Sequence, residues 1–311
     1  MEKRKRSRKR VLIITADDFG YCPKRDRGIF ELFLEKKISR TSVLLSGYSS
    51  RHALDVAGKK SYSVGLHLNL TEGYPIGVSS FESSLTNEWG EFLAKADFAS
   101  ALANGLISDK DLKLEITEQI RAFRRISHDH NLPVHIDGHQ HVHVLPEVSR
   151  ILDTVLDDLG MTNVSIRYPF ELLSDVDWVK EENLQFYRSV SSLATACQSF
   201  FNKYRHPDGF IGMSIMGSNM TLARLRAKLE ETYNYLNSTL DKDVAVVELM
   251  VHPGYKSLSH VGGCGFLGPD QFSMSVEREH ELNLLKSPEF SEILEELGIQ
   301  LAHSENVSNF L

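Results

Sequence analysis

The sequence predicts an α/β protein and, within that class, a closed or nearly closed (β/α) barrel. About eight short strand-like runs alternate with helical patterns along the 311 residues, and no internal linker divides them. Candidate functional groups fall at the ends of at least four of these runs. An open doubly wound sheet is the alternative, but such dispersal favours a barrel, in which functional groups collect at one end of many strands.

The predicted strands are short and rich in β-branched or other apolar residues, as expected for buried parallel strands. In order along the chain they are Val11–Thr15, Ser42–Ser46, Val64–Leu68, Val134–Ile136, Val164–Ile166, Phe210–Met213, Val244–Met250 and Ile299–Leu301. We expect them to belong to one domain, spanning residues 11–311.

Three segments show helical periodicity and should form part of the outer layer: Lys24–Lys37, Leu112–Ile126 and Leu222–Leu236. Three other segments are too long or too rich in turn residues for ordinary connections: Thr71–Phe98, Tyr168–Arg205 and Gly254–Ser275. We expect these to form lids or substrate walls.

Composition limits the class of partner. The apolar fraction of 41% and charged fraction of 25% are ordinary for a globular protein, and the formal charge of −7 argues against nucleic-acid binding. The three cysteines are widely spaced, which suggests neither a disulfide framework nor a thiolate metal site. With no apolar run of about 18 residues and no apolar signal segment, we expect an intracellular, cytoplasmic protein without a membrane partner.

The first ten residues, Met1–Arg10, carry seven Lys or Arg and one Glu. Such a run could be a nuclear-localisation patch or an arm for an acidic partner. Because like charges repel and bury nothing, we interpret it as a solvated, disordered lead-in without a catalytic role.

Two adjacent carboxylates, Asp17 and Asp18, follow the first predicted strand. Alternate side chains of a strand face opposite sides, so only a turn after the strand can redirect one of them, and their roles should differ. One could bind a cation while the other takes a proton from water. The plainer alternative is a helix N-cap beside a surface acid.

Histidines gather near two other strand ends. His67 lies on the opposite face of its strand from the neighbouring aliphatic residues, although a lone strand histidine is more often structural. The segment His135–His143 holds four further imidazoles and Asp137 within nine residues. Its histidines would share one face if extended, so not all can bind one cation, and the break at Gly138 suggests that His139 turns into the site.

Two more candidates complete the set. His252 ends the strand-like run before a Pro-Gly turn and is well placed as a general acid, unless it is only a turn histidine. Arg167 could hold a carboxylate or a substrate oxygen, or form an ordinary ion pair. Two histidines and one carboxylate suit Zn, Mn, Co or Fe and leave room for water, and the additional acid and base favour hydrolysis over oxygen chemistry.

Taken together, these motifs resemble the YdjC-like carbohydrate deacetylases, over about residues 11–303. The resemblance rests on Ala16–Gly20, His67–Asn69, His135–His143 and His252–Gly254. It is strongest to the eukaryotic members, which share Thr15–Pro23 and the Gly262–Gly265 loop.

The resemblance implies a distorted, TIM-like (β/α) barrel of the glycoside hydrolase/deacetylase type, which removes acetyl groups from N-acetylated sugars or oligosaccharides, as the related bacterial chitooligosaccharide deacetylases do. By the same resemblance, Asp18, His67 and His139 are the expected metal ligands. Asp17 is the expected general base and His252 the general acid, while Arg167 and Asp137 are orienting groups.

The resemblance also implies one divalent metal ion. Family members are usually assigned magnesium, but imidazole ligands fit Zn, Mn or Co better. The bacterial relatives suggest a homodimer. Two alternatives remain: a metal-dependent amidase or esterase acting on a non-sugar acyl group, and a non-enzymatic interaction protein that has kept the barrel.

Overall fold

The computed structural model describes residues 8–78, 81–126, 134–258, 260–265 and 268–311. Within these ranges, eight parallel strands pair into one sheet. They are β1 (Lys9–Phe19), β2 (Arg40–Val43), β3 (Val64–Leu68), β4 (Val134–Gly138), β5 (Val164–Ile166), β6 (Gly209–Ile211), β7 (Val244–Val251) and β8 (Ile299–Leu301). Each of the eight predicted strands is present, although the second begins at Arg40 and ends at Val43 rather than running from Ser42 to Ser46.

The start of the chain differs from the expectation. β1 begins at Lys9 rather than Val11, so the end of the basic segment belongs to the sheet. The guanidinium of Arg8 donates to the backbone carbonyls of Leu236, at 2.8 Å, and Lys242, at 2.5 Å. Leu236 lies in the last turn of the helix Leu222–Thr239 and Lys242 in the loop that follows it, so these arginine contacts hold the start of the chain against that helix end and are structural. Met1–Ser7, the rest of the expected lead-in, lies outside the described residues.

The strand order is β5-β4-β3-β2-β1-β7-β6, with β8 on the N-terminal half of β1. β1 to β5 therefore lie side by side in sequence order, and β7 and β6 continue the sheet on the other side of β1. The curved sheet is nearly closed between β5 and β6 by Arg205, whose backbone bonds to Ile166 at 2.8 Å and to Val164 at 3.2 Å. Seven strands thus surround the interior and β8 lies outside this circuit, which confirms a distorted barrel.

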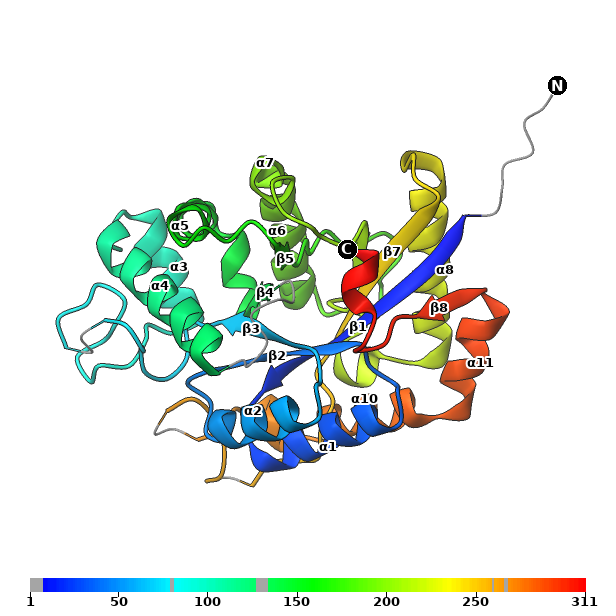
Figure 1. Cartoon of the computed structure of the whole chain (residues 1–311), viewed down its shortest axis with the longest axis horizontal. Helices are drawn as coiled ribbons and strands as arrows, with labels where there is room; N and C mark the ends of the chain where they lie inside the picture. Colours follow the sequence, from blue (N-terminus) through cyan, green and yellow to red (C-terminus); the bar gives the residue numbers. More distant parts are fainter. Residues whose placement is uncertain (1–7, 79–80, 127–133, 259, 266–267) are drawn as a thin grey trace.

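Helices cover the outside of the sheet (Figure 1). Those described are α1 (Pro23–Leu34), α2 (Ser50–Lys59), α3 (Lys95–Ala103), α4 (Asp109–Ile126), α5 (Pro146–Asp158), α6 (Glu181–Ala196), α7 (Gln198–Phe201), α8 (Leu222–Thr239), α9 (Gln271–Met274), α10 (Glu277–Lys286) and α11 (Pro288–Glu296), with the 3₁₀ helices η1 (His139–Val144), η2 (Gly217–Asn219) and η3 (Val307–Phe310). The three predicted helices correspond to α1, α4 and α8. No helix in the described ranges is long and apolar enough to cross a membrane.

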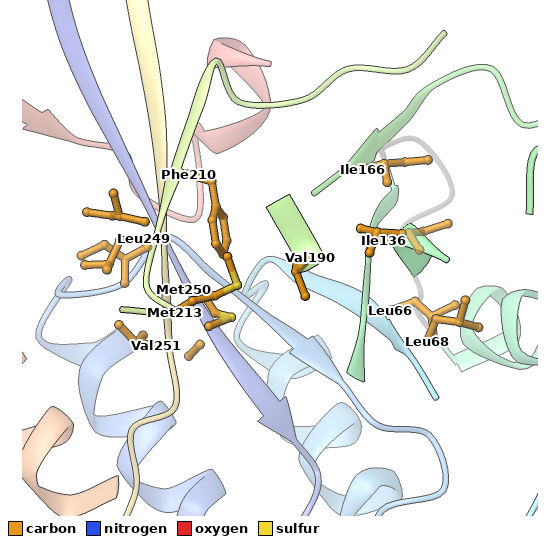
Figure 2. Packing of buried hydrophobic residues seen from close by; sticks show 14 of the residues in the cluster. Leu66, Leu68, Ile136, Ile166, Val190, Phe210, Met213, Leu249, Met250 and Val251 are labelled. Atoms are coloured by element: carbon orange, nitrogen blue, oxygen red, sulfur yellow. The ribbon is translucent and has the colours of Figure 1, made fainter. Parts of the chain in front are cut away.

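In β3, β4 and β5, alternation along the strands places apolar residues on the outer face of the sheet. Leu66, Leu68, Ile136 and Ile166 lie together on one side of the sheet (Figure 2), where they join a buried cluster with residues of α4 and α5. His67, between the two leucines, points the other way, as the period of two requires.

The barrel interior holds buried ion pairs below the strand ends. The guanidinium of Arg40 lies 3.2 Å from Oε1 of Glu248, which also accepts hydrogen bonds from Thr15 at 2.7 Å and Arg167 at 3.1 Å. Burial alone would raise the pKa of Glu248, but the two arginines lower it to about 2. This network supports the functional groups that lie above it.

Candidate functional site

A cavity of about 320 Å³ opens at the C-terminal ends of the strands. Five of the residues predicted from sequence line it: Asp17, Asp18, His67, His139 and His252. They come from the ends of β1, β3, β4 and β7, which meet at one edge because all the strands are parallel. The remaining two, Asp137 and Arg167, lie immediately beneath and contact the lining residues.

An irregular strand end turns two adjacent carboxylates toward the same space. Asp18 has φ of 60°, in the left-handed region, and the pairing of β1 with β2 shifts register between Ala16 and Phe19. Aspartate tolerates this conformation better than most residues. The turn expected after the strand therefore takes place at Asp18 itself, and both Asp17 and Asp18 reach the cavity.

Asp18, His67 and His139 form a buried group with the donor set of a metal site. Oδ1 of Asp18 lies 3.4 Å from Nε2 of His67 and 3.2 Å from Nδ1 of His139. That oxygen has no well-directed hydrogen bond among the described residues, although it is buried. A buried acceptor without a partner is costly, and a cation between these three atoms would satisfy it.

Both imidazoles are held from behind by a carboxylate. Nδ1 of His67 lies 2.6 Å from Oδ1 of Asp137, its register partner on β4. Nε2 of His139 lies 3.0 Å from Oε2 of Glu72. Such contacts fix the ring orientation and the tautomer, which leaves Nε2 of His67 and Nδ1 of His139 directed at Asp18. Sequence reasoning identified Asp137 but missed Glu72.

The protonation of this group is set by its own charges. Burial would lower the pKa of both imidazoles, but Asp137 and Asp18 raise the pKa of His67 to about 10, and Asp18 and Glu72 raise that of His139 to about 9. Burial would raise the pKa of Asp18, yet His139, His67 and Arg25 hold it well below its usual range. The residues therefore fit a divalent cation, which would take the place of the imidazole protons.

Two arginines bind the other carboxylate oxygen of Asp18. Oδ2 accepts from Arg25 at 3.0 Å and from Arg278 at 3.1 Å, and all three side chains are buried. This leaves only Oδ1 facing the histidines. Sequence reasoning missed both arginines, because nothing in the spacing of residues in α1 or α10 indicates contact with the end of β1.

Asp17 is fixed by a bidentate ion pair. The guanidinium of Arg167 donates to both carboxylate oxygens of Asp17, each at 2.7 Å, and also lies 2.9 Å from Oδ2 of Asp137. Burial raises the pKa of Asp17, and Arg167 opposes this only in part. A carboxyl group with a raised pKa is suited to accept a proton.

His252 completes the site beside Asp17. Its Nε2 lies 3.9 Å from Oδ2 of Asp17, and Nδ1 has no partner among the described residues. The backbone N–H of His252 donates to the buried carboxylate of Glu281, another residue that the sequence did not reveal. Burial and the nearby Arg278 hold the pKa of His252 well below its usual range, so its imidazole is neutral near neutral pH.

The histidine-rich segment separates into different environments. β4 ends at Gly138, and His139 turns into the cavity as predicted. The chain reverses at Gln140 and His141, with φ of 53° and 60°, rather than at Gly138 itself. Gly138 is required for space, because a Cβ there would lie 2.6 Å from Nδ1 of His143. His143 contacts the carbonyl of Arg167 at 3.1 Å and faces away from Asp18.

The three long segments expected to form lids or walls each contribute to the cavity. Lys95 comes from the first, Phe186 and Tyr187 from α6 in the second, and Asp270 and Phe272 from the third. Burial lowers the pKa of Lys95 to about 8. Lys95 lies over the ring of Phe186 and Arg278 over that of Phe272. The lining therefore combines aromatic side chains with a few polar groups, an arrangement typical of sites for small polar ligands.

Comparison with known proteins places this chain in one protein family. The family model described as YdjC-like protein matches residues 11–296. A carbohydrate deacetylase of Danio rerio is 38% identical over 306 residues, which cover 93% of this chain and 96% of the relative. A chitooligosaccharide deacetylase of Yersinia enterocolitica is 26% identical, with 94% and 97% covered. The crystal structure of a proposed cellobiose-phosphate cleavage protein from Enterococcus faecalis superposes with a TM-score of 0.68 at 21% identity. The superposition covers 96% of this chain and 99% of that one, and it supports the fold but no particular function.

Proposed function

Because this chain belongs to the YdjC-like protein family, we propose that it is a metal-dependent hydrolase that removes acetyl groups from N-acetylated carbohydrates. The substrates would be N-acetylglucosamine-type sugars or oligosaccharides. The observation that carries the proposal is one cavity lined by a two-histidine, one-carboxylate group and by a separate aspartate and histidine suited to proton transfer.

Asp18, His67 and His139 would hold the metal ion. When bound, a divalent cation would polarise the acyl carbonyl and lower the pKa of water. Two imidazole ligands favour Zn, Mn or Co over Mg, which prefers oxygen ligands. Arg25 and Arg278 fix Oδ2 of Asp18 and so leave Oδ1 as the available carboxylate ligand.

Asp17 would act as the general base. Arg167 orients both of its oxygens, and the raised pKa of Asp17 suits it to take a proton from water as the water attacks the acyl carbon. Asp137 supports the same arrangement through its contacts with Arg167 and His67.

His252 would protonate the leaving amine, because an amine leaves poorly unless it is protonated. Its neutral resting state means that it must gain this proton during the cycle. Asp17 lies 3.9 Å away, so the proton taken from water could reach His252 through a water molecule or after the two side chains approach each other to hydrogen-bond distance. The pair then returns to its starting state once the amine has left.

Aromatic residues at the cavity mouth favour a sugar over other acyl substrates. Phe186, Tyr187 and Phe272 line the cavity, where the edges and faces of their rings that Lys95 and Arg278 leave uncovered could contact a sugar ring. An amidase or esterase acting on a non-sugar acyl group would use the same catalytic residues, so the substrate must be tested directly. A purely binding role is less well supported, since the ligand group and both proton-transfer residues are intact.

The direct test is acetate release from N-acetylglucosamine and its oligosaccharides. Metal-stripped protein would be reloaded with Zn, Mn, Co or Mg and compared with Asp17→Asn treated in the same way. Release that depends on the metal and is lost in the variant is the expected result. Absence of release across the panel, with one metal ion bound per chain, would exclude this function and shift support to another acyl substrate or a binding role.

A further inference from the structure

A second hollow of about 460 Å³ adjoins the catalytic cavity. We call it the side groove, and the residues of its lining that matter here are Thr71, Glu72, Trp89, Glu91, Asp97 and Asp270. Asp270 lines both hollows, and Glu72 contacts His139 of the candidate metal site. A molecule longer than one sugar could therefore extend from the cavity into the side groove.

We propose that the side groove binds a second sugar unit of an oligosaccharide and favours a unit that carries a protonated amine. This inference rests on the proposed deacetylase function, because it names the kind of substrate that the same site accepts. Three independent features of the groove carry it: a buried hydroxyl without a partner, an exposed tryptophan and a lining of carboxylates.

The hydroxyl belongs to Thr71. Its side chain is buried, with the residue 5% exposed, and Oγ1 has no hydrogen-bond partner among the described residues. The backbone N–H of Thr71 donates to Oδ1 of Asn69 at 3.1 Å, so this acceptor already has a donor other than the hydroxyl. Buried polar atoms are normally paired, and Thr71 is one of the residues that line the groove, so a polar ligand such as a sugar hydroxyl could supply the missing partner of Oγ1.

The tryptophan supplies an apolar surface. Trp89 is 67% exposed at the groove, and its backbone N–H is anchored to Oδ1 of Asn87 at 3.0 Å. Large exposed aromatic side chains on an ordered turn are typical of binding surfaces. The C–H face of a pyranose ring is apolar and flat, so it can pack on the indole.

The carboxylates decide which sugar fits. Glu72, Glu91, Asp97 and Asp270 line the groove, and no lysine or arginine does so within the part of the chain that the structure describes. An anionic sugar would be repelled, whereas an ammonium group would be attracted. Deacetylation itself creates such an amine, so a partly deacetylated oligosaccharide matches the groove and the cavity together.

The experiment uses the disaccharide of glucosamine, which has no acetyl group to remove, as a probe in calorimetric titration of the full chain. Trp89→Ala should weaken binding about three- to tenfold and Thr71→Val about threefold, and added salt should weaken wild-type binding. Glu91→Gln should reduce affinity for this probe more than affinity for its N-acetylated counterpart. Phe81→Ala and Glu292→Gln, exposed positions outside the groove, are matched controls.

Absence of probe binding, or binding that Trp89→Ala and Glu91→Gln leave unchanged, would overturn the proposal. An equal loss in the two control variants would overturn it too. The result is separate from acetate release: a chain that binds the probe through Trp89 but releases no acetate supports the groove and contradicts the deacetylase, and the reverse pattern contradicts the groove alone.

Discussion

Arg167, which directly follows β5, binds both carboxylate oxygens of Asp17, near the end of β1, each at 2.7 Å. The pair fixes a carboxylate that lines the cavity beside the candidate metal group without belonging to it. A bidentate guanidinium sets both the position and the plane of the carboxylate, which a lysine could not do. The same guanidinium also contacts Asp137 and Glu248, so the catalytic edge and the buried network form one unit.

Asp17→Asn should abolish most turnover without releasing the metal. The amide cannot accept the proton of water, and loss of a general base costs about 10²- to 10⁴-fold in rate. Steady-state acetate release and the metal content of the purified protein measure the two effects, with the exposed Asp241→Asn as the matched control. A variant that loses metal in proportion to activity would show that Asp17 acts as a ligand instead.

His252→Gln should lower kcat by about 10²- to 10⁴-fold and leave metal affinity close to that of the wild type. Its imidazole lies 3.9 Å from Asp17 and is not part of the group around Asp18, so the loss falls on protonation of the amine. Substrates with better leaving groups should be less affected, which a series of acylated amines of decreasing pKa can measure. His52→Gln, exposed on α2, controls for loss of a histidine.

Local patterns were enough to predict the strands and much of the site. Buried parallel strands are short apolar runs, so all eight were visible in sequence, and His67 was assigned to the inner face by the period of two alone. The carboxyl ends of parallel strands meet at one edge. Residues as distant in sequence as Asp17 and His252 could therefore be predicted to lie together.

The parts of the site that could not be predicted depend on contacts made by loops and on the dihedral angles of single residues. Glu72 reaches His139 from a segment without regular period, and Arg278 reaches Asp18 across 260 residues. The left-handed conformation of Asp18 follows from packing around the end of β1. No sequence period encodes such contacts, and the left-handed conformations of Gln140 and His141, directly after His139, show the same limit.

Glu72→Gln should weaken metal binding about tenfold, because the carboxylate that orients His139 and increases its basicity is lost. Glu91→Gln is the matched control, since Glu91 lines the same groove but has no contact with His139. Competition titration with a metal chelator compares the two. Equal metal affinity in both variants would contradict an orienting role for Glu72.

Metal binding should release about two protons per ion at pH 7. The pKa values of His67 and His139 in the metal-free protein are raised to about 10 and about 9, so both imidazoles are protonated until the metal displaces their protons. Metal affinity should therefore rise with pH and level off above about 10. Calorimetry in buffers of different ionisation enthalpy counts the protons; release of none would contradict the assignment of these two ligands.

Glu248→Gln should destabilise the fold by about 3–5 kcal/mol, because it leaves Arg40 buried without an anionic partner. Glutamine has nearly the same volume, so the loss reports charge rather than packing. Urea unfolding at pH 7.5 gives the free energy of unfolding. The exposed Glu292→Gln, on α11, should change it by less than about 0.5 kcal/mol.

The pH dependence of the same variant tests whether ionised Glu248 stabilises the folded state. The pKa of Glu248 is about 2 when folded, below the ordinary value of 4.5, so the folded state binds this proton less readily than the unfolded chain. Its stabilising contribution is complete above pH 4.5 and is lost as pH falls toward 2. The difference in unfolding free energy between wild type and Glu248→Gln should therefore shrink below pH 4.5. A difference that stays constant down to pH 3 would mean that the ionised carboxylate of Glu248 does not stabilise the barrel interior.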